Sequence, residues 1–472
     1  MFLLSFLIIP VVAAIVLLSI KHEKYAQYIA IVAGVASLTA AVNIILNNVG
    51  VVDLTWLQVL NSRFVLQADG LSKILILLTA ISFPAIFIAT SKNQVANKNI
   101  FLSLMLFTQA GLMGVFLAGD ALLFYFFWEL ALIPVYFLCS IWGGEKRIAV
   151  TFKFFIYTFL GSLFMLIGIV YMYMHTKDHS FAYASFKAAG LTNMQQVTAF
   201  ALFFIAFAIK MPIFPLHTWQ PDAYDQSPTS VTMVLSAVMV KMGLYGVLRW
   251  LMPLFPGAFS AHTHFVMVLS IIGILYASFI AIKQDNIKKL IAYSSIAHIG
   301  LMSAALFANK EMGAQGVLIQ LFSHGINVLG LWIIADIIEQ QTGTKLLSEM
   351  GGLAKKQPTL AILLVAFSFA NVALPLTNAF VGEFLMFNSL FQVNPWMAAA
   401  AGVSVVLAAI YTLNMVQKCA YGEVSTAIQK MSVNKPAQAV LIVLIIIVFV
   451  TGVYPQPLFD LTKDTLLQLF VK

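Results

Sequence analysis

Six ionisable side chains stand within long apolar stretches of this sequence. They are two glutamates, two lysines and two histidines, namely Glu129, Lys210, Lys241, His298, His324 and Glu383. Burial makes a lysine release its proton more readily and a nearby carboxylate opposes this, so a glutamate–lysine pair can hold or release a proton. Histidine can pass a proton through either ring nitrogen. The combination predicts proton transfer along a polar axis.

Each of these groups also has a structural alternative. The glutamates and lysines could form structural ion pairs, and each histidine could make one hydrogen bond between helices. An ionisable group at the centre of a bilayer costs several kcal/mol, so we favour the functional interpretation.

Other polar groups lie beside helix breaks or near the ends of apolar stretches. His217 follows two prolines, where it would either relay a proton or cap carbonyl groups that the break exposes. Lys73 and Lys153 are expected to extend to the membrane surface. Asp336 and Glu339 are expected to be solvated.

The composition indicates that these ionisable groups lie in a membrane protein. Of 472 residues, 61% are hydrophobic and only 9% are charged, against roughly a quarter charged in an ordinary soluble domain. Soluble enzymes, nucleic-acid binders and disulfide scaffolds are therefore excluded. The two cysteines, Cys139 and Cys419, fit no metal or disulfide framework, so we expect no metal site. The chain is predicted to be an all-α polytopic membrane protein.

Apolar stretches of sufficient length predict about fourteen transmembrane helices. Two of them contain prolines that break a helix, within residues 210–217 and 374–378. Their predicted starts are near residues 2, 25, 70, 98, 120, 149, 197, 228, 264, 288, 312, 357, 396 and 436.

Broken helices five spans apart are typical of transporters with inverted repeats. The alternative is two unrelated proline kinks. We expect two inverted five-helix repeats, formed by spans 4–8 and 9–13. This predicts an N-terminal three-helix segment (1–97), a first repeat with the input half-channel (98–252), a second repeat with the output half-channel (264–420) and a C-terminal helix and tail (436–472).

Lysine and arginine predict the orientation. Loops after odd-numbered spans hold 15 of the 26 basic residues, and loops after even-numbered spans together with the C-terminus hold seven. The positive-inside rule places the first set of loops in the cytoplasm and both termini on the opposite face. The net charge of +8 then reflects topology and not a nucleic-acid partner.

Six separated motifs resemble the antiporter-like subunits of respiratory complex I, the proton-pumping NADH:quinone oxidoreductase, and they occur in the family's order. They are Trp-Glu-Leu-Ala-Leu-Ile-Pro at 128–134, Lys-Met-Pro with Pro-Leu-His-Thr-Trp-Gln-Pro-Asp-Ala at 210–223, Val-Lys-Met-Gly-Leu-Tyr-Gly at 240–246, Tyr-Ser-Ser-Ile-Ala-His-Ile-Gly at 293–300, Ser-His-Gly at 323–325 and Phe-Val-Gly-Glu-Phe at 380–384.

This resemblance implies a role for each matching residue. Glu129 and Lys210 would be the coupling pair of the input half, and Lys241 the bridge to the centre. His298 and His324 would connect that bridge to Glu383, the exit site towards the periplasm. Glu383 also separates this chain from subunits L and N and from Mrp-type antiporter subunits, which resemble one another in having a lysine there.

The resemblance implies a multi-pass protein of the bacterial inner membrane, with L and N subunits as neighbours in the lipid bilayer. NADH, flavin, iron–sulfur and quinone chemistry would belong to other subunits, so we expect no cofactor on this chain. Three alternatives remain: an Mrp-type cation/proton antiporter subunit, a membrane subunit of an energy-converting hydrogenase, and a scaffold that conducts nothing.

One segment departs from the family pattern. The family commonly continues the Pro-Asp-Ala motif with a histidine and then a Glu-Ala-Pro-Thr run, whereas residues 223–229 read Ala-Tyr-Asp-Gln-Ser-Pro-Thr. A histidine and a glutamate are missing near the predicted cytoplasmic end. Asp225 could supply a displaced carboxylate there.

Overall fold

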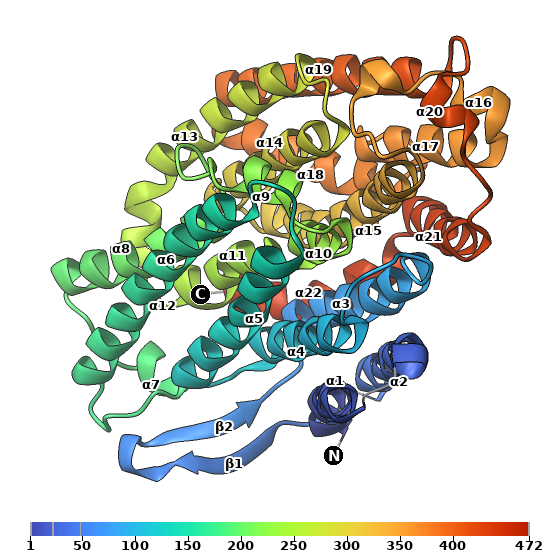
Figure 1. Ribbon diagram of the computed structural model, residues 1–472. Helices are drawn as coiled ribbons and strands as arrows, with labels where there is room; N and C mark the ends of the chain where they lie inside the picture. Colours follow the sequence, from blue (N-terminus) through green and yellow to red (C-terminus); the bar gives the residue numbers. More distant parts are fainter. Residues whose placement is uncertain (1, 21–22, 48, 471–472) are drawn as a thin grey trace.

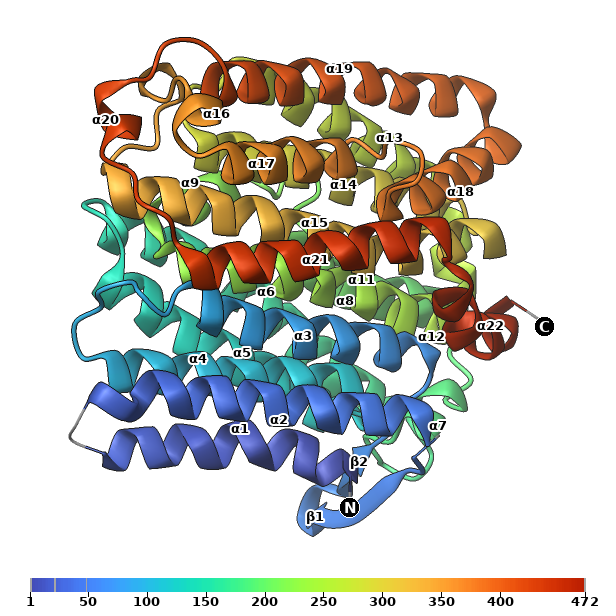
Figure 2. The ribbon, with the colours of Figure 1, turned by 90° about the vertical axis from the view of Figure 1, so that its right-hand side faces the viewer.

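The long helices lie side by side in a bundle (Figures 1 and 2). The computed structural model describes residues 2–20, 23–47 and 49–470. Figure 2 shows that the first helix begins, and the last helix ends, at the same end of the bundle. An even number of spans requires this arrangement.

The N-terminal part contains three spans and a β-hairpin that projects from one end of the bundle (Figure 1). Its strands are antiparallel. The all-helical prediction omitted this hairpin, although residues 52–57 alternate between apolar and polar side chains, as strands do. The elements are α1 (Phe2–Ser19), η1 (Glu23–Tyr25), α2 (Ala26–Leu46), β1 (Val52–Leu57), η2 (Gln58–Leu60), β2 (Ser62–Leu66) and α3 (Gly70–Ala89).

The next part contains the first broken helix, whose halves are α8 and α9. Its elements are α4 (Lys98–Leu117), α5 (Ala121–Trp142), α6 (Arg147–His175), α7 (Tyr183–Lys187), α8 (Asn193–Lys210), α9 (Gln220–Gln226), α10 (Thr229–Val234), η3 (Leu235–Met239), α11 (Lys241–Gly246), η4 (Val247–Leu251) and α12 (Met252–Leu254). The last five of these elements form one continuous span, in which η3 and η4 are π-helical turns.

The remaining part contains the second broken helix, whose halves are α17 and α18. Its elements are α13 (Pro256–Ile282), α14 (Ile287–Phe307), α15 (Glu311–Thr342), η5 (Leu347–Glu349), α16 (Leu353–Lys356), α17 (Pro358–Asn371), α18 (Asn378–Val393), α19 (Pro395–Ala420), α20 (Thr426–Gln429), α21 (Lys435–Val453) and α22 (Gln456–Phe470).

The predicted number of spans is confirmed. Thirteen helices of the described residues are long and apolar enough to cross a membrane, and the α17–α18 pair supplies the fourteenth span. The predicted start of the ninth span, near residue 264, is wrong, because α13 begins at Pro256. Proline lacks the N–H that a first helical turn leaves unpaired, so it starts this helix instead of extending the loop.

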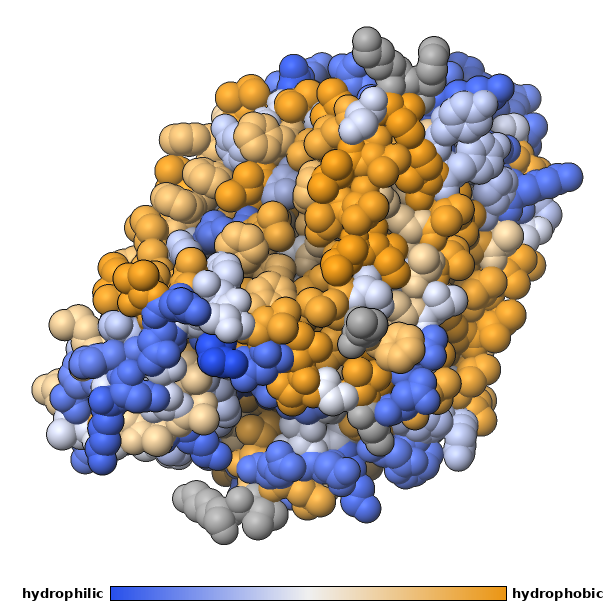
Figure 3. All heavy atoms as spheres, turned by 90° about the horizontal axis from the view of Figure 1, so that it is seen from below, coloured by the Kyte–Doolittle hydropathy of each residue, from blue (hydrophilic) through white to orange (hydrophobic). Residues whose placement is uncertain are grey.

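The spans divide into a central group and a peripheral group. The span formed by α10 to α12, together with α14 and α15, is almost entirely buried, whereas α1, α2, α6, α19 and α21 expose one apolar side. Figure 3 shows the exposed apolar residues as a broad area between hydrophilic ends. This surface suits contact with lipid or with other membrane subunits.

A glycine permits close backbone contact between α4 and α5. A Cβ atom added to Gly111 of α4 would lie 2.5 Å from the backbone nitrogen of Ala131 in α5. Small residues at such positions let two helix backbones approach in a membrane, where packing replaces the hydrophobic effect as the source of association.

We predict that Gly111→Ala destabilises the protein by about 1–3 kcal/mol, because the added methyl group must displace backbone. Gly402→Ala is the matched control, since no atom of the described residues beyond its own helix lies within 4 Å of a Cβ atom at that helical position. The thermal midpoint of the purified protein should fall for the first variant only. Equal thermal midpoints for the two variants would contradict the claim that packing of α4 against α5 requires glycine at position 111.

Candidate functional site: a buried axis of lysine, histidine and glutamate

Four of the six predicted residues form a continuous line in the middle of the bundle. Lys241 Nζ lies 2.9 Å from His324 Nδ1. The ring centroids of His324 and His298 are 5.4 Å apart. His298 Nδ1 lies 3.1 Å from Glu383 Oε1. Because all four side chains are buried, these contacts connect α11, α15, α14 and α18 through the protein interior.

A π-helical turn precedes the lysine of this line. Lys241 follows η3, where the Val240 N–H reaches back to the Leu235 carbonyl. Lys241 Nζ donates to the Ser236 carbonyl of the same turn at 2.6 Å. Turns of this kind occur frequently at functional sites. The ammonium group therefore has two acceptors, a backbone carbonyl and an imidazole, and neither is a carboxylate.

The second helix break positions the glutamate. Between α17 and α18, Ala373 and Leu376 adopt positive φ angles of 56° and 74°, which are uncommon for residues other than glycine. Asn327 of α15 donates to the Ala370 carbonyl at 3.0 Å, and Ser323 donates to the Asn378 carbonyl at 3.0 Å. The break is thus attached to the helix that carries His324.

The glutamate has a second neighbour on that helix. Gln320 Nε2 donates to Glu383 Oε1 at 3.3 Å, and Gln320 precedes His324 by one helical turn. Sequence reasoning missed Gln320, although its spacing from His324 places both side chains on one face of α15.

The predicted input pair is not formed as an ion pair. Lys210 is buried at the end of α8, its Nζ has no hydrogen-bond partner among the described residues, and it lies 5.6 Å from the centre of the Trp128 ring. Glu129 lies beside Tyr125 and Ser162 and within electrostatic reach of Lys210. Glu129 is half-buried, because it lies on the side of α5 next to exposed Phe126 and Ile133.

The first helix break brings Lys210 near the helix of Lys241. A Cβ atom added to Gly243 would lie 2.7 Å from both the Met211 nitrogen and the Phe207 carbonyl oxygen. Only glycine allows α11 to pack this closely against the end of α8. The two lysines nevertheless make no direct contact in the described structure.

His217 is buried beside this break, between aromatic rings. Its ring centroid lies 5.7 Å from that of Phe214 and 5.2 Å from that of Tyr276, and its Nδ1 has no partner in the described structure. Trp219 donates to the Ile209 carbonyl at 3.1 Å. The indole of Trp219, and not His217 Nδ1, therefore caps a carbonyl group at this break.

Several buried polar atoms, on the axis, in η3 and on α9, lack protein partners in the part of the chain that is described. They include Tyr224 Oη, Ser236 Oγ, both polar atoms of the Gln220 side chain, and Nε2 of both His298 and His324. Buried polar atoms are nearly always satisfied, and internal water is the usual partner when protein is not. These atoms favour a hydrated connection.

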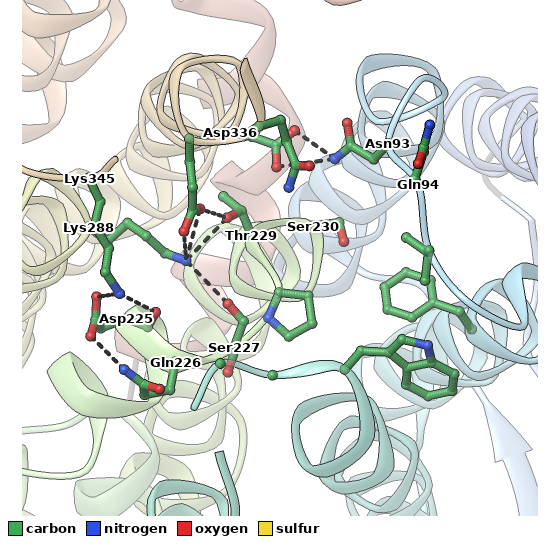
Figure 4. A pocket seen from close by; sticks show the side chains of 18 of the residues that line it. Asn93, Gln94, Asp225, Gln226, Ser227, Thr229, Ser230, Lys288, Asp336 and Lys345 are labelled. Carbon is green, nitrogen blue, oxygen red and sulfur yellow. Dashed lines mark hydrogen bonds and ion pairs between the residues drawn. The ribbon is translucent and has the colours of Figure 1, made fainter. Parts of the chain in front are cut away.

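Asp225, Lys288 and Lys345 are among the residues that line a pocket of about 340 Å³ with several charged side chains, the charged pocket (Figure 4). Lys345 Nζ contacts Asp225 Oδ1 at 2.6 Å, and Lys288 Nζ contacts Glu339 Oε2 at 3.2 Å. Burial raises the pKa of Asp225, but Lys345 and a hydrogen bond from Asn286 outweigh it and hold that pKa below its ordinary value.

One prediction about the polar groups near span ends needs revision. The expectation that Asp336 is solvated is wrong, because this side chain is buried and accepts hydrogen bonds from Asn93 Nδ2 at 2.9 and 3.2 Å. Lys153 reaches a half-exposed position, where it pairs with Asp222 at 3.0 Å. Among the described residues, no group of three or more His, Cys, Asp or Glu side chains could hold a metal ion.

Comparisons with known proteins identify the family of this chain. The family profile described as NADH:quinone oxidoreductase/Mrp antiporter, TM, matches residues 118–410. Subunit M of NADH-quinone oxidoreductase from Rhodobacter capsulatus is 36% identical over 98% of this chain and 94% of its own length. The M subunit from Escherichia coli K12 is 33% identical over 88% of this chain and 84% of its own length.

The chain belongs to this family, as an M subunit. The resemblance that the six motifs predicted is confirmed, as is the fold. A chain of respiratory complex I from Thermus thermophilus with bound NADH superposes over the full length of both chains, with a TM-score of 0.91 and 27% identity. A chain of the Mrp complex from Dietzia sp. gives a TM-score of 0.88 at 20% identity over 99% of this chain and 97% of its own, which shows a shared fold alone.

The departure from the family pattern lies in the charged pocket of this M subunit. Asp225 supplies a carboxylate there, and its partner Lys345 follows α15, which lies in the predicted second repeat. The pair therefore ties the element after the first helix break to the other half of the chain. Sequence spacing gave no signal for this pairing, because 120 residues separate its members.

We predict that Asp225→Asn weakens the attachment of α9 by about 2 kcal/mol, the contribution of a hydrogen bond to a charged group. Amide hydrogen exchange in α9 should accelerate. Because the pKa of Asp225 is lowered, its contribution is complete above the ordinary carboxyl pKa and is lost only as the pH falls through the lowered value. The difference between variant and parent should thus stay constant between about pH 5 and 8.

The charge-swapped variant Asp225→Lys with Lys345→Asp is the control. Restored protection in the swapped protein, and loss in either single variant, would establish the pair. Unchanged exchange in Asp225→Asn would show that the ion pair does not hold α9.

Proposed function

We propose that this M subunit moves protons from the cytoplasm to the periplasm within a type I NADH:quinone oxidoreductase. Glu129 and Lys210 serve the input half, Lys241, His324 and His298 connect the halves, and Glu383 is the exit site. Redox chemistry takes place in other subunits. This chain converts the conformational or electrostatic change that arises there into proton movement. Its neighbours in the bacterial inner membrane are the antiporter-like L and N subunits.

The observation that supports this proposal most directly is the contact between Lys241 and His324 at 2.9 Å. Burial of the lysine favours release of its proton, and Nδ1 of His324 is an acceptor within reach. A lysine held only for packing would not need an imidazole acceptor next to a second imidazole and a carboxylate. The line therefore suits stepwise transfer better than a static ion pair.

Transfer between the two histidines needs an intermediate. His324 receives the proton at Nδ1 and His298 faces Glu383 with Nδ1, so both imidazoles have Nε2 available. Neither Nε2 has a partner in the described structure. A water molecule between the two rings would accept from one Nε2 and donate to the other, and the proton would then pass to Glu383.

The orientation rests on the distribution of basic residues. The lysine-rich loops face the cytoplasm under the positive-inside rule, which places both termini in the periplasm. The half-buried Glu129 lies on an apolar flank of α5 that a neighbouring subunit could cover. A change in that neighbour would then alter the carboxylate's effect on Lys210 and begin the transfer.

We expect Lys241→Ala, in an assembled complex, to abolish the contribution of this subunit to NADH-driven proton uptake, because the acceptor His324 loses its donor. Proton movement per NADH oxidised in membrane vesicles is the measurement. Lys153→Ala is the matched control, since Lys153 is half-exposed and pairs with Asp222 outside the line. An unchanged ratio in Lys241→Ala would overturn the proposal.

The exit role of Glu383 gives a separate prediction. Glu383→Gln keeps the side-chain volume and an acceptor for Gln320 but cannot carry a proton, so uptake per NADH should fall. Glu383→Lys restores a titratable group and should recover part of the uptake. If the glutamine variant pumps as the parent does, Glu383 is not on the path.

A further inference from the structure

A small cavity lies beside the glutamate and histidine that end the line. Its volume is about 20 Å³, and its lining includes His298, Glu383, Tyr411 and Ala408. A space needs roughly 10–15 Å³ and two to four polar partners to hold one water molecule. The carboxylate, the imidazole and the phenol supply such partners, so the cavity fits one water.

The Tyr411 phenol belongs to a hydrogen-bonded chain of side chains. This chain includes none of the predicted site residues. Asn371 Nδ2 donates to Ser294 Oγ at 3.0 Å, and Ser294 Oγ lies 3.0 Å from Tyr411 Oη. All three side chains are buried. Because the serine oxygen accepts from the amide, its own hydrogen is free to point to the phenol oxygen, and the phenol hydrogen is free to point into the cavity.

We propose that Tyr411 is a positioning residue for Glu383, acting through one water molecule in this cavity. In this proposal, Ser294 donates to Tyr411, so that the donors run in one direction, from Asn371 to Ser294, Tyr411, the water and the carboxylate. A chain of aligned donors stabilises the charged form of the acceptor at its end. The inference rests on the proposed exit role of Glu383. It adds that the Tyr411 chain sets how firmly Glu383 holds its proton.

The start of this chain links it to the second helix break. Asn371 is the last residue of α17, and α18 begins only at Asn378. A shift of the break would move the Asn371 amide away from Ser294 and weaken every later donor in the chain. Glu383 would then hold a proton more firmly, so the geometry of the break would set when the proton is accepted.

Other groups around Glu383 do not duplicate this effect. In the described structure, His298 faces it from α14 and the uncharged amide of Gln320 from α15. The neighbouring helix α17 has no charged residue, and α21 has only Lys435 at its first position. Within this set, His298, Gln320 and the Tyr411 chain are the groups that can donate to the carboxylate, and only the Tyr411 chain begins at the helix break.

The test uses the intact purified complex with Tyr411→Phe, which removes one hydroxyl group. The infrared band of the protonated Glu383 carboxyl is identified as the band that Glu383→Gln lacks, and it is titrated against pH. Loss of the Tyr411 hydroxyl donor destabilises the Glu383 carboxylate. The pH midpoint of the Glu383 titration should therefore rise by about one unit. The pH profile of proton uptake per NADH should move in the same direction.

Two further variants sharpen the test. Ala408→Val fills the cavity while leaving the Tyr411 hydroxyl in place, and it should raise the midpoint as Tyr411→Phe does. Tyr245→Phe is the control, because Tyr245 is equally buried but donates to the Phe116 carbonyl at 3.0 Å. It should leave the midpoint unchanged.

The outcomes separate this inference from the proposed function. A midpoint in either Tyr411→Phe or Ala408→Val that equals that of the parent overturns the role of Tyr411. Normal proton uptake in Glu383→Gln overturns the exit role instead, whatever the infrared titration shows.

Discussion

The cost of an ammonium group far from water governs the architecture of this chain. Lys241 has no exposed surface, and among the described residues its Nζ makes hydrogen bonds only with the Ser236 carbonyl and the His324 imidazole. Such a group is tolerated only inside protein, so its span must be surrounded on all sides by other helices. The peripheral helices, with their exposed apolar residues, provide that enclosure and form the boundary with lipid or other subunits.

The same physical constraint explains what the sequence could predict. Because lipid excludes unpaired backbone groups, spans appear as long apolar stretches and breaks as prolines at membrane depth. The prediction of fourteen spans and the positions of both breaks followed from this rule. Lys241, His298, His324 and Glu383 were found for a related reason: charge is so scarce at depth that each instance is visible.

What the sequence could not predict depends on contacts between distant segments. Asp336 seemed solvated because it is near a helix end, but Asn93, 243 residues away, covers and binds it. Glu129 seemed buried because its depth along α5 is central, yet depth says nothing about which side of the helix faces outward. The donors at Tyr411 and Gln320 were missed because neutral polar residues are common in membrane helices and carry little signal alone.

The two halves of the polar line differ in a way that bears on mechanism. From Lys241 to Glu383, contacts or adjacent rings join four helices, whereas Lys210 has no protein partner among the described residues and lies against Trp128. A connected segment can equilibrate a proton quickly, and a disconnected one cannot. In the proposed mechanism, control over transfer therefore belongs at Lys210, beside the first helix break, where a small displacement of Glu129 or of water would open or close the connection to Lys241.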